Sequence, residues 1–116
     1  YAVIDMGTNS EESCDYPDIA KKVAQAVGSD QTKKGILICG TGIGMSIAAN
    51  KVKGVRAAHV SNEYEAQMAK QHNDANVLCL GARTTDKETT IKCVEAWLSS
   101  VFEGGRHERR IGKLEE

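Results

Sequence analysis

Residues 35–46 have the sequence Gly-Ile-Leu-Ile-Cys-Gly-Thr-Gly-Ile-Gly-Met-Ser, and this stretch decides the expected fold. Gly35 to Cys39 is a short, continuous apolar run, which is typical of a strand buried on both faces of a parallel sheet. The alternating glycines that follow predict a tight turn, and a helix is predicted from about Met45 to Val52. A buried strand that leads through a glycine-rich turn into a helix indicates an α/β protein.

The same alternation of strands and helices extends in both directions. Strands are predicted at 1–6, 55–60 and 76–80, and helices at 15–28, 62–72 and from Asp86 onward, with Asp15 and Asp86 as N-caps. The buried stripe expected on the last of these helices is Ile91, Val94, Trp97, Leu98 and Val101. The pattern predicts one α/β domain over residues 1–116, a three-layer α/β/α sandwich with a parallel sheet between helix layers, and a basic C-terminal tail at 104–116.

In such a sheet, ligands bind beyond the carboxyl ends of the strands. The loop after Cys39 is therefore the strongest candidate for chemistry. Its glycines allow a ligand to approach the backbone, and the N–H groups of a helix start suit a phosphate or a developing oxyanion. Cys39 is placed to act as a base or nucleophile, and Thr41 adds a hydroxyl donor. The alternative interpretation of these residues is a glycine-rich turn that is needed only for packing. A dinucleotide site fits less well, because Met45 stands where the fingerprint requires glycine.

Composition excludes several classes of protein. The chain has 116 residues and a net charge of −1, which argues against nucleic-acid binding driven by bulk electrostatics. No apolar run approaches the roughly 20 residues that cross a bilayer, so no membrane partner is expected. The cysteines form neither a CxxC pair nor a zinc-binding spacing, which suggests reduced thiols in a cytoplasmic protein without a metal site. They are Cys14, Cys39, Cys79 and Cys93.

Other polar residues lie elsewhere in the chain. The segment 72–76 precedes a predicted strand, so a role for His72 in the pocket of Cys39 would need a second subunit, whereas a helix cap and turn explains it without a function. Arg106 and Arg110 share one helix face and match a phosphate dianion, or they belong to a solvated basic tail. Arg83, after the fourth strand, is a further phosphate candidate, and His59 is expected to be structural.

Four segments together resemble the ribose-5-phosphate isomerase B family, whose superfamily includes the galactose-6-phosphate isomerase subunits. They are 15–18, 39–51, 72–78 together with 80–83, and 102–110, and they follow one register along essentially the whole chain. The resemblance implies a Rossmann-like α/β/α fold. It also implies interconversion of aldose and ketose phosphates without metal or organic cofactor, in a cytoplasmic enzyme of the pentose phosphate pathway. It also implies a homodimer, or a dimer of dimers, whose active sites combine both subunits.

The resemblance assigns catalytic roles first. Cys39 matches the base that moves a proton between C1 and C2 of the sugar. Some members use glutamate at the position of Met45, so this chain is expected to be of the cysteine type. Thr41 matches a group that stabilises the enediolate, and His72 matches the histidine implicated in opening the furanose ring. The remaining matches bind substrate through loop amides, the sugar or the phosphate: Gly40, Gly42, Gly44, Tyr16, Asn73, Arg83, Arg106 and Arg110.

One departure from the family concerns the front of the chain. The family begins with a strand ending in an Asp-His pair, followed by a helix, and nothing in residues 1–116 corresponds to them. We expect the sequence to be shorter at its front than the full protein. Two alternatives remain: a galactose-6-phosphate isomerase, or a non-catalytic subunit that binds a sugar phosphate.

Overall fold

The computed structural model describes residues 1–7 and 15–116. Within them, three parallel strands form one sheet in the order β1-β3-β2. The strands are β1 (Gly35–Cys39), β2 (Ala57–His59) and β3 (Val77–Gly81). The helices are α1 (Tyr16–Ser29), α2 (Ile43–Ala49), α3 (Glu63–Gln71), α4 (Lys87–Ser99) and α5 (Arg106–Leu114). None of these described helices combines the length and apolar character needed to cross a bilayer.

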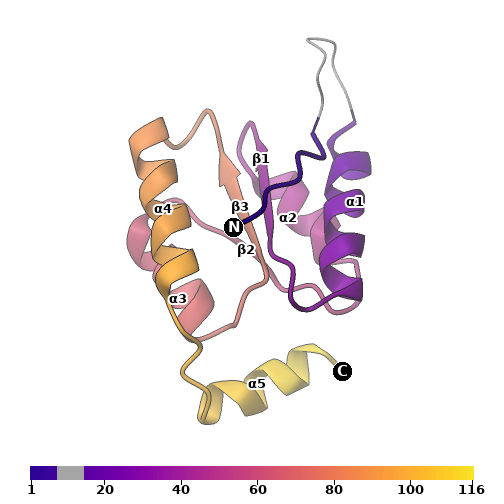
Figure 1. Ribbon diagram of the computed structural model, residues 1–116, viewed down its shortest axis with the longest axis vertical. Helices are drawn as coiled ribbons and strands as arrows, with labels where there is room; N and C mark the ends of the chain where they lie inside the picture. Colours follow the sequence, from indigo (N-terminus) through magenta and orange to yellow (C-terminus); the bar gives the residue numbers. More distant parts are fainter. Residues whose placement is uncertain (8–14) are drawn as a thin grey trace.

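The sheet is the middle layer of three. Helices α1 and α2 pack on one face and α3 and α4 on the other, while α5 lies apart, near the end of the sheet where the strands begin (Figure 1). Strand β3 is central and all five of its residues are buried. Successive side chains of a strand point to opposite faces, so Val77 and Cys79 join the core under α1 and α2, while Leu78 and Leu80 join the core under α3 and α4. The α/β/α prediction is confirmed.

Helix boundaries follow local signals. Asp86 caps α4, because its Oδ1 accepts the N–H of Thr89 at 2.7 Å. Asp15 occupies the N-cap position of α1 but makes no side-chain cap bond. Helix α2 begins two residues earlier than predicted, at Ile43. It does so because Gly42 takes a left-handed φ of 82°, which turns the chain directly into the helix.

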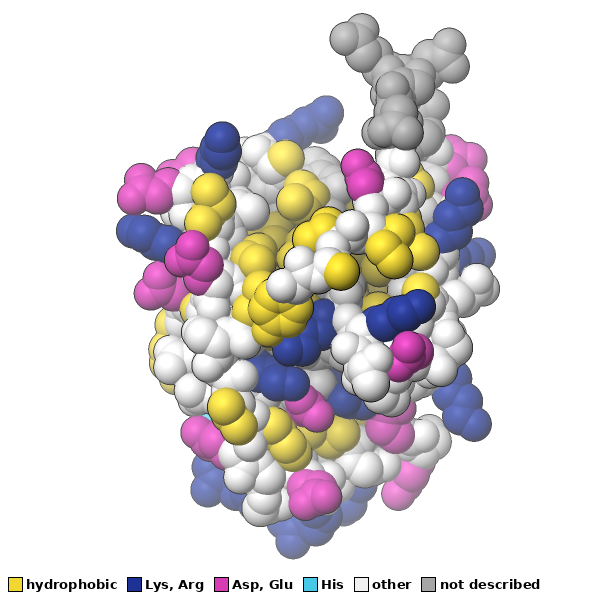
Figure 2. Space-filling view, viewed as in Figure 1, with side chains coloured by type: hydrophobic (Ala, Val, Ile, Leu, Met, Phe, Trp, Pro, Cys, Tyr) yellow, Lys and Arg dark blue, Asp and Glu magenta, His cyan; other side chains and the backbone are white. Residues whose placement is uncertain are grey.

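Two burial predictions were wrong. Ile36 and Ile38 of β1 are 42% and 50% exposed, because β1 is an edge strand of the described sheet and one of its faces is not covered. Hydrophobic side chains gather on that side of the molecule, where the N-terminal segment passes (Figure 2). In the predicted stripe of α4, Ile91 is 46% and Val101 76% exposed, since α4 ends at Ser99 and its buried face is centred on Cys93 and Trp97.

The predicted strand at 1–6 is also not observed. These residues carry no regular secondary structure, and the ladders of the described sheet join only β1, β2 and β3. Tyr1, Val3 and Ile4 are largely exposed. An alternating pattern favours an extended chain, but a strand also needs a hydrogen-bonding neighbour, which the pattern does not specify.

Candidate active site

The loop after Cys39 holds the thiol against a backbone amide. Cys39 ends β1, and its Sγ accepts the N–H of Gly42 at 3.1 Å. A side chain at position 42 would place its Cβ 2.8 Å from the carbonyl carbon of Leu80, so the chain can close around the sulfur only with glycine there. The half-buried thiol therefore lies at the carboxyl end of the sheet, in contact with a hydrogen-bond donor.

Thr41 lies at the tip of the same loop and is held from two sides. Its Oγ1 accepts the N–H of Ile43 at 3.2 Å, which leaves the hydroxyl hydrogen able to donate. Its carbonyl oxygen lies 2.7 Å from Nε2 of His59, and because a carbonyl only accepts, that nitrogen carries the proton. His59 thus has the structural role that was expected: it fixes the loop.

Tyr16 and Arg83 flank the loop. A Cβ on Gly44 would lie 2.6 Å from the Tyr16 hydroxyl, so the phenol ring lies directly against the loop. The Arg83 side chain lies over Gly40, and the backbone N–H of Arg83 donates to the Gly40 carbonyl at 3.0 Å. The structure therefore brings together most of the residues predicted for the site. We call this group the Cys39 cluster: Tyr16, Cys39, Gly40, Thr41, Gly42, Gly44 and Arg83.

Burial distinguishes Cys39 from the other described cysteines. Desolvation, with a smaller contribution from the neighbouring Cys39, raises the pKa of the Cys79 thiol to about 12. Desolvation also raises the pKa of Cys93, with Glu63 and Glu65 adding to the effect. Cys79 therefore stays protonated at neutral pH, and both thiols are buried in the core. Cys14 falls outside the described residues. Met45 is 5% exposed and points into the core, so it takes no part in the loop chemistry.

The other predicted site residues lie at the opposite end of the sheet. His72 is the C-cap of α3, just before β3 begins, and α5 carries two of the predicted arginines. Strand β3 separates this end from the Cys39 loop by about 13 Å. This second group, the His72 cluster, consists of His72, Asn73, Arg106 and Arg110. The expectation that His72 lies away from the loop after Cys39 is confirmed within the chain.

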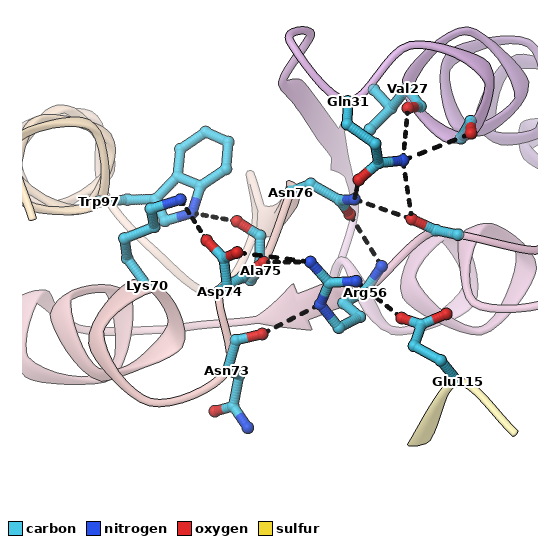
Figure 3. A network of polar contacts seen from close by, with 12 residues as sticks. Val27, Gln31, Arg56, Lys70, Asn73, Asp74, Ala75, Asn76, Trp97 and Glu115 are labelled. Carbon is cyan, nitrogen blue, oxygen red and sulfur yellow. Dashed lines mark hydrogen bonds and ion pairs between the residues drawn. The ribbon is translucent and has the colours of Figure 1, made fainter. Parts of the chain in front are cut away.

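Arg56 supports the turn that carries His72 and Asn73. Its Nε donates to the Asn73 carbonyl at 3.1 Å and its Nη2 to the Asp74 carbonyl at 2.9 Å (Figure 3). Asp74 has a φ of 45°, unusual for a residue other than glycine, and its carboxylate also pairs with Lys70. Nη1 of Arg56 binds Glu115 at 2.7 Å, which ties the end of α5 to the same turn. The Asn73 side chain points away from this network (Figure 3).

We expect Arg56→Ala to lower the free energy of unfolding by about 2–3 kcal/mol, because it removes charged hydrogen bonds from a side chain that is only 17% exposed. The midpoint of urea denaturation measures this change. Lys92→Ala is the matched control: it removes an ion pair with Glu88 whose partners are 56% and 81% exposed, and it should cost less than about 1 kcal/mol. Equal shifts for both variants would contradict the role given to Arg56.

Sequence reasoning missed Arg56, Glu103 and His107. The latter two join His72 in a compact group whose potential ligand atoms lie within 4.8 Å of one another. Arg56 binds Glu115, which is 59 residues away, and no local sequence pattern predicts this contact. His107 lies inside the basic segment that was singled out for its arginines, and Glu103 lies in the connection between α4 and α5.

Comparisons with a family model, with known sequences and with solved structures all point to one family. The family model described as Ribose/Galactose Isomerase matches residues 1–114. Ribose-5-phosphate isomerase B of Escherichia coli is 52% identical over 109 residues, which are 94% of this chain and 73% of that protein. A Clostridium thermocellum ribose-5-phosphate isomerase B structure superposes with a TM-score of 0.96 at 53% identity, covering 99% of this chain and 78% of that one.

A second solved structure carries a ligand. Ribose-5-phosphate isomerase B of Mycoplasma genitalium, with bound ribulose-5-phosphate, has a TM-score of 0.96 and 50% identity, covering 99% of this chain and 77% of that chain. The family match spans nearly the whole chain, and each of these relatives is at least half identical to it. The chain therefore belongs to the ribose/galactose isomerase family, within its ribose-5-phosphate isomerase B branch.

Proposed function

We propose that this protein is an aldose–ketose isomerase that interconverts ribose 5-phosphate and ribulose 5-phosphate through a cis-enediolate. The observation that carries the proposal is the contact between Cys39 Sγ and the Gly42 amide, 3.1 Å long, in a glycine loop at the carboxyl end of the sheet. It places a proton acceptor beside hydrogen-bond donors, which is what proton abstraction next to a carbonyl requires. Relatives at about half identity named ribose-5-phosphate isomerase B support the choice of sugar.

In the proposed mechanism, the Cys39 thiolate removes the proton from C2 of the open-chain aldose. Negative charge develops on the carbonyl oxygen at C1, where loop amides between Gly40 and Gly44 and the Thr41 hydroxyl stabilise it. The thiol then returns the proton to C1, a proton moves from O2 to O1, and the ketose forms. These groups are fixed in position before substrate arrives, because Gly42 and His59 already hold the loop.

The phosphate is bound by arginines in this proposal. Arg83 lies beside the Cys39 loop, and Arg106 and Arg110 are exposed on one face of α5. Guanidinium groups form paired, charge-assisted hydrogen bonds with phosphate oxygens. Anchoring the phosphate fixes the distance from C5 to the reacting carbons, so the arginines set the register of the sugar over Cys39.

The separation of the two clusters is the reason to propose a dimer. His72 and Cys39 belong to opposite ends of β3 in one chain, so a common site needs the His72 cluster of a second copy. The domain proposed for the isomerase is the whole of residues 1–116, and its basic tail at 104–116, which contains α5, contributes to the neighbouring site. A cytoplasmic enzyme of pentose phosphate interconversion fits this reaction.

Substrate length tests the proposal. The purified protein should turn over ribose 5-phosphate with a kcat/KM at least about tenfold above that for galactose 6-phosphate, because one extra carbon between the phosphate and the carbonyl moves C2 away from Cys39. Ketose formation is followed for both sugars under identical conditions. A preference for the six-carbon sugar would assign the galactose activity instead, and binding without turnover of either would indicate a non-catalytic subunit.

A further inference from the structure

Next to the His72 cluster, the Glu103 carboxylate lies beside the Nε2 edges of two stacked histidines. The rings of His72 and His107 stack with centroids 4.2 Å apart and planes 10° from parallel. Oε1 of Glu103 lies 3.5 Å from Nε2 of His72 and 3.6 Å from Nε2 of His107, so one oxygen faces both rings. The Glu103 N–H also bonds the carbonyl of Gln71 at 3.0 Å, which fixes the carboxylate beside the end of α3.

The stacking favours a proton-holding group over a metal site. A metal ion binds imidazole along the nitrogen lone pair, which lies in the ring plane at about 2.0–2.1 Å from the metal. Two nearly parallel rings cannot both direct their lone pairs at one ion unless the stack breaks. Both Nε2 atoms instead lie within ion-pair distance of the same Glu103 oxygen in the stacked arrangement.

We infer that Glu103 is a positioning residue for ring opening and acts through His72; this rests on the proposed function. Its carboxylate keeps the His72 proton on Nε2, which leaves Nδ1 as the acceptor nitrogen. The same logic orients a histidine in other acid–base sites, where a carboxylate fixes the tautomer and stabilises the cation that forms. His107, stacked on one face of the His72 ring, fixes the plane of that ring.

The step that Glu103 supports can be written in full. Nδ1 of His72 takes the proton from the anomeric hydroxyl of the furanose. The C1–O1 bond becomes a carbonyl as the bond from C1 to the ring oxygen breaks, and the ring oxygen keeps that electron pair and takes a proton from water. The imidazolium on His72 is stabilised by the Glu103 carboxylate and returns its proton to solvent. His107 does not compete for the proton, because desolvation and then the charge of His72 lower its pKa.

The chemistry of the two sugars allows a sharp test. Ribose 5-phosphate is cyclic and must open before reaction, whereas ribulose 5-phosphate has its 5-hydroxyl esterified and cannot form a furanose. Enzyme-catalysed exchange of the C1 hydrogen of ribulose 5-phosphate in D2O therefore needs Cys39 but no ring opening. For Glu103→Gln we expect kcat for ribose 5-phosphate to fall at least about tenfold, with the exchange rate in ribulose 5-phosphate within about twofold of wild type.

Glu108→Gln is the matched control, since Glu108 is an exposed carboxylate in the first turn of α5. It should leave both rates unchanged. Glu103→Gln with normal turnover of ribose 5-phosphate would overturn the inference, and so would an equal loss of both rates, which would indicate a general structural or binding role. Failure of the wild-type protein to catalyse either reaction would instead refute the proposed function, so the two failures are distinguishable.

Discussion

Cys39→Ala should lower kcat for ribose 5-phosphate by about 10²- to 10⁴-fold, the range over which a general base contributes to catalysis. Substrate binding should stay close to normal, because the phosphate and the sugar hydroxyls are bound by other groups. The loop itself should keep its shape: Gly42 remains free to take its φ of 82°, and His59 still bonds the Thr41 carbonyl. Steady-state kinetics and a separate measurement of the sugar-phosphate Kd distinguish these effects.

Ser46, in helix α2 directly after the loop, provides a control for this prediction. Ser46→Ala removes a hydroxyl that donates to the Ile43 carbonyl at 2.8 Å, one turn back in α2. It should leave kcat within about twofold of wild type, since surface substitutions of this kind change little. Near-normal turnover by Cys39→Ala would refute Cys39 as the base, whereas loss of activity in both variants would point to disturbance of the loop.

The second large effect concerns the sharing of the site between copies. Cys39→Ala and His72→Ala should each be nearly inactive alone, because each substitution removes one of the two required side chains from every site. Mixed after unfolding and refolding together, they should regain up to about one quarter of wild-type activity: half of randomly paired dimers are mixed, and each mixed dimer has one intact site. The activity of the refolded mixture, against wild type refolded in the same way, measures this.

The matched negative control is a mixture of Cys39→Ala with Cys39→Ser. Both substitutions remove the same side chain, Cys39. No pairing of the two chains therefore restores an intact site, and activity should stay at the level of the single variants. Recovery in the Cys39–His72 mixture but not in this one supports a site built from two copies. A Cys39–His72 mixture with no recovery would contradict the shared site, provided that refolded wild type is active.

The sequence predicted those parts of the fold that local signals define. Glycines at 40, 42 and 44 mark a turn because of their backbone freedom, and the structure shows why one of them is required: Gly42 has a positive φ and packs on the Leu80 carbonyl. The apolar run of β3 is buried on both sides, as such runs predict. The similar run of β1 is exposed on one face, because β1 lies at the edge of the described sheet and nothing covers that face. An apolar run does not indicate whether a strand has a covering neighbour.

The residues of the Cys39 cluster could be predicted from the sequence, whereas the contacts around His72 and Arg56 could not. Cys39, Thr41 and Arg83 follow strand ends directly, where parallel sheets place their ligands, so sequence position alone indicates them. Glu103 and His107 matter through their contacts with His72, which lies more than thirty residues earlier. Arg56 is a single cation whose partners lie at 73, 74 and 115. Such roles arise only when the chain has folded.

Proton transfer on a five-carbon sugar phosphate can be followed by NMR of ribose 5-phosphate incubated with the wild-type protein in D2O. Ribulose 5-phosphate should appear, and at least part of it should carry deuterium at C1, because the Cys39 thiol exchanges its proton with solvent before returning it. No ribulose 5-phosphate, or product that retains the original C2 hydrogen at C1 with no deuterium at all, would rule out this mechanism.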